Sequence, residues 1–490
     1  MHYYLGIDCG GTFIKAAIFD QNGTLQSIAR RNVPIISEKP GYAERDMDEL
    51  WNLCAQVIQK TIRQSSILPQ QIKAIGISAQ GKGAFFLDKD NKPLGRAILS
   101  SDQRACEIVQ CWQKENILQK FYPITLQTLW MGHPVSILRW IKENEPSRYE
   151  QIHTILMSHD YLRFCLTEKL YCEETNISES NFYNVREGKY DIQLAKLFGI
   201  TECIDKLPPI IKSNKIAGYV TSKAAEQSGL VEGIPVVGGL FDVVSTALCA
   251  DLKDDQHLNV VLGTWSVVSG VTHYIDDNQT IPFVYGKYAE KNKFIIHEAS
   301  PTSAGNLEWF VNQFNLPNYD DINHEIAKLK PASSSVLFAP FLYGSNAKLG
   351  MQAGFYGIQS HHTQIHLLQA IYEGVIFSLM SHLERMQVRF PNASTLRVTG
   401  GPAKSEVWMQ MLADISGMRL EIPNIEETGC LGAALMAMQA ESAVEISQIL
   451  NIDRKIFLPD KNQYSKYQHK YHRYLKFIEA LKNLLKKEKL

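Results

Sequence analysis

The start of the chain predicts two strands joined by a tight polar turn. Tyr3–Ile7 and Phe13–Phe19 are short apolar runs rich in β-branched and aromatic residues, and the sequence DCGGT lies between them. Asp20–Gly23 has the composition of a second turn. Met47–Arg63 then carries apolar residues at helical spacing, and Asp46 is placed to cap the first turn of this helix.

Two further apolar runs end in glycine-rich segments. Ile72–Ser78 has the continuous apolar character of a buried strand and is followed by QGKG and then by the strand-and-turn sequence FFLDKDNKPLG. Ile234–Gly238 has the same character and is followed by GLFD and an apolar helix through Ala250. The region between Ser100 and about Pro235 is mixed and richer in helical patterns.

The order of strand, Gly/Thr turn and strand then returns. Leu258–Leu262 and Ser266–Tyr274 predict strands on either side of Gly263-Thr264-Trp265. This repeat indicates a duplicated α/β fold, and the polar segment DLKDDQ predicts a boundary between domains at 1–250 and 251–490. The last part predicts a helix, a strand running into TGGPAKS, and an amphipathic tail helix, with apolar residues at Tyr467, Tyr471, Tyr474, Ile478, Leu481 and Leu485.

Composition narrows the class of protein. The chain has 490 residues and a formal net charge of −1, which gives no general attraction to nucleic acid or acidic lipid. Its nine cysteines form no CxxC pair, which favours reduced thiols in the cytoplasm over zinc or disulfides. We expect no signal peptide, because the N-terminus lacks a basic segment followed by an apolar one. We expect no membrane span, because the most apolar stretch, Ile234–Ala250, contains Pro235 and Asp242.

Three glycine-containing turns could bind phosphate or a nucleotide. Asp8 precedes Gly10, Gly11 and Thr12, where backbone N–H groups and a hydroxyl could approach an anion while the carboxylate holds Mg²⁺. Gly263 and Thr264 repeat this logic, and Gly400-Gly401-Pro402 could support a flat ring or ribose. Ordinary hairpin and strand–helix turns remain the alternative for each.

Asp242 lies in the most apolar part of the chain, in PVVGGLFDVVSTALCA. A buried carboxylate is costly unless it is paired, caps a helix or has a function. Asp242 could cap the helix that follows. It could also be the base that takes a proton from a substrate hydroxyl, because that role needs a carboxylate fixed at a helix start.

Two tempting motifs are set aside. Gly76–Gly83 nearly fits the phosphate-binding pattern G-x4-G-K-[ST], but Gly83 replaces the hydroxyl residue and a strand-like sequence follows in place of a helix. His361, His362 and His366 lack the glutamate of an H-E-x-x-H zinc motif, so we expect surface histidines at a helix start.

Together these motifs resemble the FGGY-type carbohydrate kinases of the actin/hexokinase-like (ribonuclease H-like) ATPase superfamily. The most specific match is AGFYGI, seven further residues and HLLQAIYEG, ending at Glu373-Gly374, and the resemblance covers about Tyr3 to Leu481. The stretches ISAQGKG, AILSSDQRA, NISESN and HEASPTS resemble bacterial L-xylulose kinases rather than glycerol or D-xylulose kinases. In one departure, the family's N-terminal signature has a Lys where GHPVSILRW has Ser136 or Ile137.

The resemblance implies two α/β domains that close over a sugar and ATP, with Asp242 as the catalytic base. It implies Mg²⁺ near Asp8 and a cytoplasmic enzyme that is a homodimer. It also implies further binding residues, which are, for the phosphates, Gly10, Gly11, Thr12, Lys15, Gly263 and Thr264; for adenosine, Gly400, Gly401, Pro402 and Glu406; and for the sugar, Gln80, Gly81, Lys82, Asp102 and Asn176.

Other functions stay open at this point. The kinase could act on L-ribulose, D-xylulose, glycerol or 3-keto-L-gulonate in place of L-xylulose, because one sequence does not show the shape of a pocket. A sugar-binding regulator without catalysis is disfavoured by the joint presence of Asp8, Thr12, Thr264 and Asp242. A chaperone-type or filament-forming ATPase is disfavoured by the long signature that ends at Glu373-Gly374.

Overall fold

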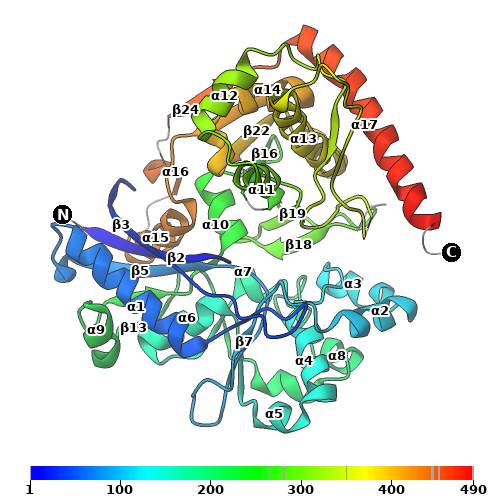
Figure 1. Ribbon diagram of the computed structural model, residues 1–490. Helices are drawn as coiled ribbons and strands as arrows, with labels where there is room; N and C mark the ends of the chain where they lie inside the picture. Colours follow the sequence, from blue (N-terminus) through cyan, green and yellow to red (C-terminus); the bar gives the residue numbers. More distant parts are fainter. Residues whose placement is uncertain are drawn as a thin grey trace.

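The computed structural model describes residues 2–263, 265–279, 282–348, 350–442, 446–450 and 453–487. These residues form two α/β domains, each built on a seven-stranded mixed sheet with helices on its faces (Figure 1). The first domain carries most of the N-terminal half of the chain, and the second carries most of the C-terminal half.

The first sheet has its three N-terminal strands in an antiparallel meander, and the first of these, β1, runs parallel to β5. β14 extends the sheet beyond β5 in parallel, and β13 closes this edge in the antiparallel sense. In spatial order six of the strands are β13 (Ile216–Tyr219), β14 (Pro235–Val237), β5 (Ile72–Ala79), β1 (Tyr3–Cys9), β2 (Phe13–Asp20) and β3 (Leu25–Asn32). The seventh, β15 (Leu240–Phe241), pairs with the end of β5 outside this row.

The second sheet repeats this plan with one more strand at the meander edge. Its order is β18 (Val284–Lys287), β19 (Phe294–Ser300), β17 (Ser266–Thr272), β16 (His257–Leu262), β22 (Thr395–Thr399), β23 (Arg419–Pro423) and β24 (Arg454–Phe457). β16, β17 and β19 are antiparallel, β22 and β23 follow in parallel, and β24 is antiparallel. The predicted duplicated α/β fold is confirmed.

The region between Ser100 and Pro235 contains more helix than strand, as the sequence predicts. α1 (Met47–Gln64) begins as expected, with the Asp46 side chain accepting a hydrogen bond from the backbone N–H of Glu49 at 2.8 Å. The others are α2 (Cys106–Lys114), α3 (Leu118–Thr125), α4 (Pro134–Asn144), α5 (Pro146–Gln151), α6 (Ser158–Thr167), α7 (Glu174–Ile177), α8 (Ile192–Leu197) and α9 (Ser222–Ser228).

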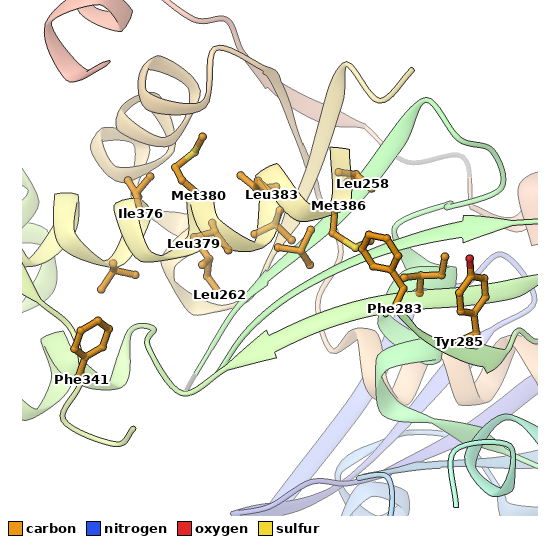
Figure 2. Packing of buried hydrophobic residues seen from close by; sticks show 14 of the residues in the cluster. Leu258, Leu262, Phe283, Tyr285, Phe341, Ile376, Leu379, Met380, Leu383 and Met386 are labelled. Atoms are coloured by element: carbon orange, nitrogen blue, oxygen red, sulfur yellow. The ribbon is translucent and has the colours of Figure 1, made fainter. Parts of the chain in front are cut away.

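The core of the second domain forms around α13 (Gln364–Arg389), the helix that follows the family-like signature. Figure 2 shows Leu379 and Met386 of this helix facing Leu262 and Phe283. The remaining helices of the second half are α11 (Gly305–Gln313), α12 (Tyr319–Ala327), α14 (Glu406–Ser416), α15 (Thr428–Glu441), α16 (Ile446–Ile449) and α17 (Lys461–Lys487).

The tail helix α17 packs along the outer side of the second domain (Figure 1). The predicted apolar stripe is buried at Tyr467, Tyr471 and Tyr474. Between them Lys470 forms a buried ion pair with Glu373 of α13, at 2.5 Å from Nζ to Oε2. The Glu-Gly pair of the signature therefore has a structural role, because its glutamate fastens the tail helix to the core.

One helix from the second half of the chain packs on the first sheet. α15 lies against β1 and β5, beside α10 (Asp242–Cys249), and both helices sit between the two sheets (Figure 1). A Cβ atom at Gly6 would lie 1.9 Å from the carbonyl oxygen of Cys430, and one at Gly76 would lie 1.9 Å from that of Ala433. Glycine is required at both strand positions because the helix backbone touches the strands directly. The division at 250/251 stays a prediction.

Two further expectations concern composition. All nine cysteines are free thiols, as expected. None of the helices in the described chain combines the length and the hydrophobicity that crossing a bilayer requires.

Candidate active site

Three neighbouring parallel strands of the first sheet end at the same edge. β1 pairs with β5 in a register that sets Asp8 opposite Ser78, and a short strand, β15 (Leu240–Phe241), sets Phe241 opposite Ala79. Ligands of open α/β sheets bind at the carboxyl ends of the strands. Asp8 and Asp242, which are far apart in the sequence, are thereby brought to one site.

The sequence pattern did not predict β15 as a separate strand. It exists because Gly238 and Gly239 interrupt the strand that begins with β14: Gly239 adopts φ +97°, and a Cβ there would lie 2.4 Å from the carbonyl oxygen of Ile77. The interruption resets the chain so that Phe241 pairs with β5 and Asp242 begins α10 at the edge of the sheet.

Asp242 is the first residue of α10, and Phe241 occupies the N-cap position. Asp242 as a whole is partly exposed, and the surrounding protein raises the pKa of its carboxyl group to about 7. Loss of hydration is the main cause and the negative charge of Asp8 adds to it, while the positive charge of Lys82 opposes it. A carboxylate with this pKa can exchange a proton near neutral pH.

Asp8 is the second carboxylate of the site. Burial raises its pKa to about 6; Lys15, its cross-strand neighbour, opposes the rise, and Glu427 adds to it. Lys15 donates to Glu427 at 2.6 Å, which ties β2 to the start of α15. Gly429 lies against Asp8, so this part of the site is shared between the two halves of the chain.

The turn at Gly10, Gly11 and Thr12 is braced from behind by a buried arginine. Arg45 donates to the carbonyl oxygen of Gly11 at 2.8 Å and to that of Gly10 at 3.4 Å. With two carbonyls held on one side, the backbone N–H groups of the turn are held in a fixed arrangement. Gln80 lies close by, since a Cβ at Gly11 would be 3.8 Å from its Oε1 atom.

The segment after β5 is fixed in an unusual conformation. Lys82 has φ +62°, its backbone N–H donates to Asn176 at 3.0 Å, and its Nζ donates to Glu179 at 2.6 Å. Gly81 has no room for a side chain, because a Cβ would lie 2.4 Å from the ring of Phe241. Three of the five predicted sugar-binding residues, Gly81, Lys82 and Asn176, therefore lie together, next to the strand that precedes Asp242.

Asp102 has a different environment. Both of its carboxylate oxygens accept hydrogen bonds, from the guanidinium group of Arg104 at 2.8 and 2.9 Å and from the backbone N–H of Ala43 at 2.7 Å. Only 1% of Asp102 is exposed. In this structure it joins Arg104 to the loop before β4 (Glu44–Arg45), and its role toward a sugar stays a prediction.

The second domain brings two of the predicted glycine turns together. Gly400 has φ +104°, and a Cβ there would lie 2.0 Å from the carbonyl oxygen of Leu262, directly before Gly263. Gly401 and Pro402 begin the short 3-10 turn that leads to α14, and open space lies next to Gly401. Thr264 lies outside the described residues.

Glu406, the other predicted adenosine contact, is the first residue of α14. Its side chain is exposed and forms an ion pair with Lys455 of β24. Its role toward adenosine stays a prediction.

Four residues that hold this site in place were not predicted from the sequence. Glu427 pairs with Lys15, Arg45 braces the first glycine turn, and Glu179 and His297 face each other across the two domains at 3.6 Å. Glu179 and His297 belong to NISESN and HEASPTS, so the segments were noticed but the pairing was not. The signal in the sequence that could have indicated this pairing was a charged residue inside an otherwise buried segment.

The histidines at the start of α13 form a ring cluster. His361 and His362 have ring centroids 4.2 Å apart, and His366 lies 5.4 Å from His362. His362 and His366 accept hydrogen bonds from backbone N–H groups of their own loop. In the parts of the chain that the structure describes, no three side chains of metal-binding type gather into a site.

The sequence matches two family models in tandem. Residues 3–249 match the N-terminal domain, and residues 258–441 the C-terminal domain, of the FGGY family of carbohydrate kinases. The chain therefore belongs to the FGGY family of carbohydrate kinases. Its substrates are accordingly ATP and a carbohydrate.

Relatives narrow the comparison within the family. A protein of Haemophilus influenzae (strain Rd) named "Probable L-xylulose kinase" is 99% identical over 484 residues, which cover 99% of this chain and 100% of that protein. A protein of Escherichia coli K12 named "L-xylulose/3-keto-L-gulonate kinase" is 54% identical over 483 residues, covering 98% and 97%.

Solved structures share the fold. The xylulose kinase of Lactobacillus acidophilus superimposes with a TM-score of 0.90 at 21% identity, over 98% of each chain. The glycerol kinase of Plasmodium falciparum, solved with ADP, gives a TM-score of 0.86 at 21% identity, again over 98% of each chain. The predicted actin/hexokinase-like architecture is confirmed.

Proposed function

We propose that this kinase transfers the γ-phosphoryl group of ATP to the terminal C5 hydroxyl of L-xylulose, with Asp242 as the general base. The observation that carries the chemistry is the environment of Asp242, whose pKa is raised to about 7 at the carboxyl edge of the sheet. A general base is most effective when its pKa lies near the working pH. The sugar is inferred from the names of two close relatives.

In this proposal the carboxylate of Asp242 accepts the proton of the attacking hydroxyl. Lys82 and Gln80, after β5, would hold the sugar beside it. The backbone N–H groups of Gly11 and Thr12 and the ammonium group of Lys15 would bind the phosphates of ATP, while the N–H group of Gly10 donates to the carbonyl oxygen of Phe13 at 3.0 Å and shapes the turn. Closure of two domains around the sugar would exclude water and so suppress simple hydrolysis of ATP.

Asp8 fits a Mg²⁺ site on chemical grounds. Carboxylate oxygen is the ligand that Mg²⁺ prefers, and Mg²⁺ in kinases commonly takes only one or two carboxylates besides phosphate and water. Burial raises the pKa of Asp8 to about 6, and neighbouring Glu427 adds to this rise, so a cation would stabilise the ionised form. When bound, Mg²⁺ would neutralise negative charge on the β- and γ-phosphates.

The second domain would bind the rest of the nucleotide. We assign the second phosphate loop to Gly263 and Thr264, and the adenosine pocket to Gly400, Gly401, Pro402 and Glu406. The division of the chain into a sugar-binding domain, 1–250, and a nucleotide-binding domain, 251–490, belongs to the same proposal. A homodimer is proposed on the family resemblance alone, and light scattering of the purified chain tests it.

A coupled ADP-release assay tests the function. Purified protein and MgATP are offered L-xylulose, D-xylulose, L-ribulose, glycerol and 3-keto-L-gulonate, with Asp242→Asn as the control. We expect the highest kcat/KM on L-xylulose and a loss of about 10²–10⁴-fold in kcat in the variant, the usual range for a general base. Near wild-type turnover by a folded Asp242→Asn protein would refute the role of Asp242. Turnover confined to another sugar would replace the substrate.

3-Keto-L-gulonate is the second candidate substrate. The observation in its favour is the name of the E. coli relative, which joins this sugar acid to L-xylulose. A sugar acid would also bring a carboxylate to a site that contains the ammonium group of Lys82. Comparable kcat/KM for the acid and for L-xylulose would show that the kinase accepts both.

A further inference from the structure

Glu179 is a fully buried carboxylate next to the proposed sugar site. It follows α7, its exposed fraction is 0%, and its Oε2 atom accepts a hydrogen bond from Lys82 Nζ at 2.6 Å. A buried carboxylate is expensive unless a partner compensates it. Lys82 is that partner, so the position of the ammonium group and the burial of the carboxylate depend on each other.

The second domain encloses the same carboxylate. A Cβ atom at Gly286 of β18 would lie 2.4 Å from Glu179 Oε1, so only glycine leaves room for the carboxylate there. The imidazole of His297 in β19 lies 3.6 Å from Glu179 Oε2. The backbone N–H of Lys287 donates to the hydroxyl of Ser178 at 2.9 Å, which fastens β18 to this segment.

The pair also lies next to the proposed base. Lys82 Nζ is 5.5 Å from the ring centre of Phe241, the residue before Asp242, and the ring of His297 is 6.1 Å from the same ring. Among the described residues, Glu179 Oε1 has no hydrogen-bond partner. Groups from both domains thus surround one charged pair beside Asp242.

We propose that Glu179 is a positioning residue of the sugar subsite, which holds the ammonium group of Lys82 beside Asp242 and is itself held by β18 and β19 of the second domain. The inference rests on the proposed function, because it takes Lys82 as a sugar contact. A lysine has a long flexible side chain, and a fixed carboxylate restricts it to one arrangement. The sugar subsite is then complete only while the two domains stay in contact at Gly286 and His297.

Steady-state kinetics on a double-mutant cycle test this role. The cycle uses Glu179→Gln, Lys82→Met and the double variant. We expect Glu179→Gln to raise the KM for L-xylulose about tenfold or more, the effect of losing one charged hydrogen bond, with the KM for MgATP within about twofold. In the Lys82→Met background, Glu179→Gln should have no further effect on the sugar KM. Independent, multiplying effects, or an unchanged sugar KM, would overturn the proposal.

Chemical labelling separates this inference from the proposed function. Lys82 is acetylated with acetic anhydride, and its rate of modification is followed by mass spectrometry in wild type and in Glu179→Gln. We expect several-fold faster labelling in the variant, because the ammonium group has lost its partner. If wild type phosphorylates no sugar, the proposed function fails, and the labelling rates alone decide the pairing. Equal rates would contradict it.

The contact between the domains has its own matched pair of variants. Gly286→Ala places a methyl group against Glu179, whereas Gly354→Ala, on β21 (Gly354–Tyr356) of the same domain, meets nothing within 4 Å. We expect Gly286→Ala to raise the sugar KM in the same way as Glu179→Gln, and Gly354→Ala to leave it within about twofold of wild type. An unchanged sugar KM in Gly286→Ala would refute the role of the second domain.

Discussion

Gly429, at the start of α15, lies directly against the carboxylate of Asp8 at the end of β1. A Cβ atom on this glycine would fall 2.4 Å from the carboxyl carbon of Asp8. The preceding segment supplies Glu427, which binds Lys15 on the strand next to β1. The position of Asp8 is therefore set by the start of a helix from the other half of the chain.

The substitution Gly429→Ala tests this contact. The new methyl group must displace either the Asp8 carboxylate or the first turn of α15, so we expect kcat to fall at least about tenfold through misplacement of a group near the phosphates. Kinetics with MgATP and L-xylulose measure this, and a thermal melt reports whether the fold persists. Wild-type kcat in the alanine variant would show that Asp8 tolerates displacement.

Asp242→Asn should stabilise the fold while it removes activity. The pKa of Asp242 is raised from 3.8 to about 7, so its ionised form costs free energy in the folded state. This cost is absent below about pH 4 and fully present above about pH 7. For a partly exposed group we expect a gain of about 1–2 kcal/mol for the Asn variant at pH 8.

Thermal melts without Mg²⁺ at pH 5 and pH 8 check this prediction. The advantage in Tm of the Asn variant should be larger at pH 8 than at pH 5. An advantage that is the same at both pH values would mean that Asp242 ionises without cost in the folded state.

Arg45→Lys should weaken the first phosphate turn. Arg45 reaches the carbonyl oxygens of both Gly10 and Gly11, and a lysine cannot form this two-pronged contact. We expect the KM for MgATP to rise several-fold with little change in the KM for the sugar. Kinetics with each substrate in turn at a saturating concentration measure the two KM values separately. A rise confined to the sugar KM would place the function of Arg45 elsewhere.

Lys470→Met should destabilise the second domain strongly. Removing one partner of a buried ion pair typically costs about 3–5 kcal/mol, because the other charge stays buried without compensation. Lys482→Met is the matched control on the same helix, since the Lys482–Glu479 pair is 3.5 Å long with a 58% exposed glutamate. We expect a large fall in Tm for the first variant and almost none for the second.

A double variant distinguishes loss of the ion pair from loss of packing as the cause of the lower stability. Glu373→Gln combined with Lys470→Met removes the uncompensated charge and should recover part of the lost stability. If the double variant is as unstable as Lys470→Met alone, packing of the lysine stem and not the charge accounts for the effect.

The local pattern of apolar residues along the chain predicted much of the fold. Tyr3–Ile7, Ile72–Ser78 and Leu258–Leu262 were expected as strands and lie within β1, β5 and β16, because buried strands leave a continuous apolar signature. The second occurrence of the order strand, turn and strand indicated that the α/β domain is duplicated. β15 was not predicted, because a strand of two residues after a glycine pair is too short to show an alternating pattern of apolar and polar residues.

The candidate site was predicted only in part. Asp8 and Asp242 were found because a carboxylate at the end of an apolar run is conspicuous in one sequence. The partners of the site, such as Glu179 and Glu427, depend on contacts between segments that are distant along the chain, which a local pattern does not contain. Asp102 was expected at the sugar only from the family resemblance, and no local pattern indicates that its oxygens accept hydrogen bonds from Arg104 and Ala43.

The packing of α15 on the first sheet has a consequence for how the protein is made. The ribosome delivers β1 and β5 early, yet the face beside Gly6 and Gly76 is covered by backbone that is synthesised hundreds of residues later. We expect that face of the first sheet to stay uncovered in the newly synthesised chain until α15 has left the exit tunnel of the ribosome. A polypeptide released early, at residue 250, would keep this face exposed and would be a natural target for chaperones and proteases.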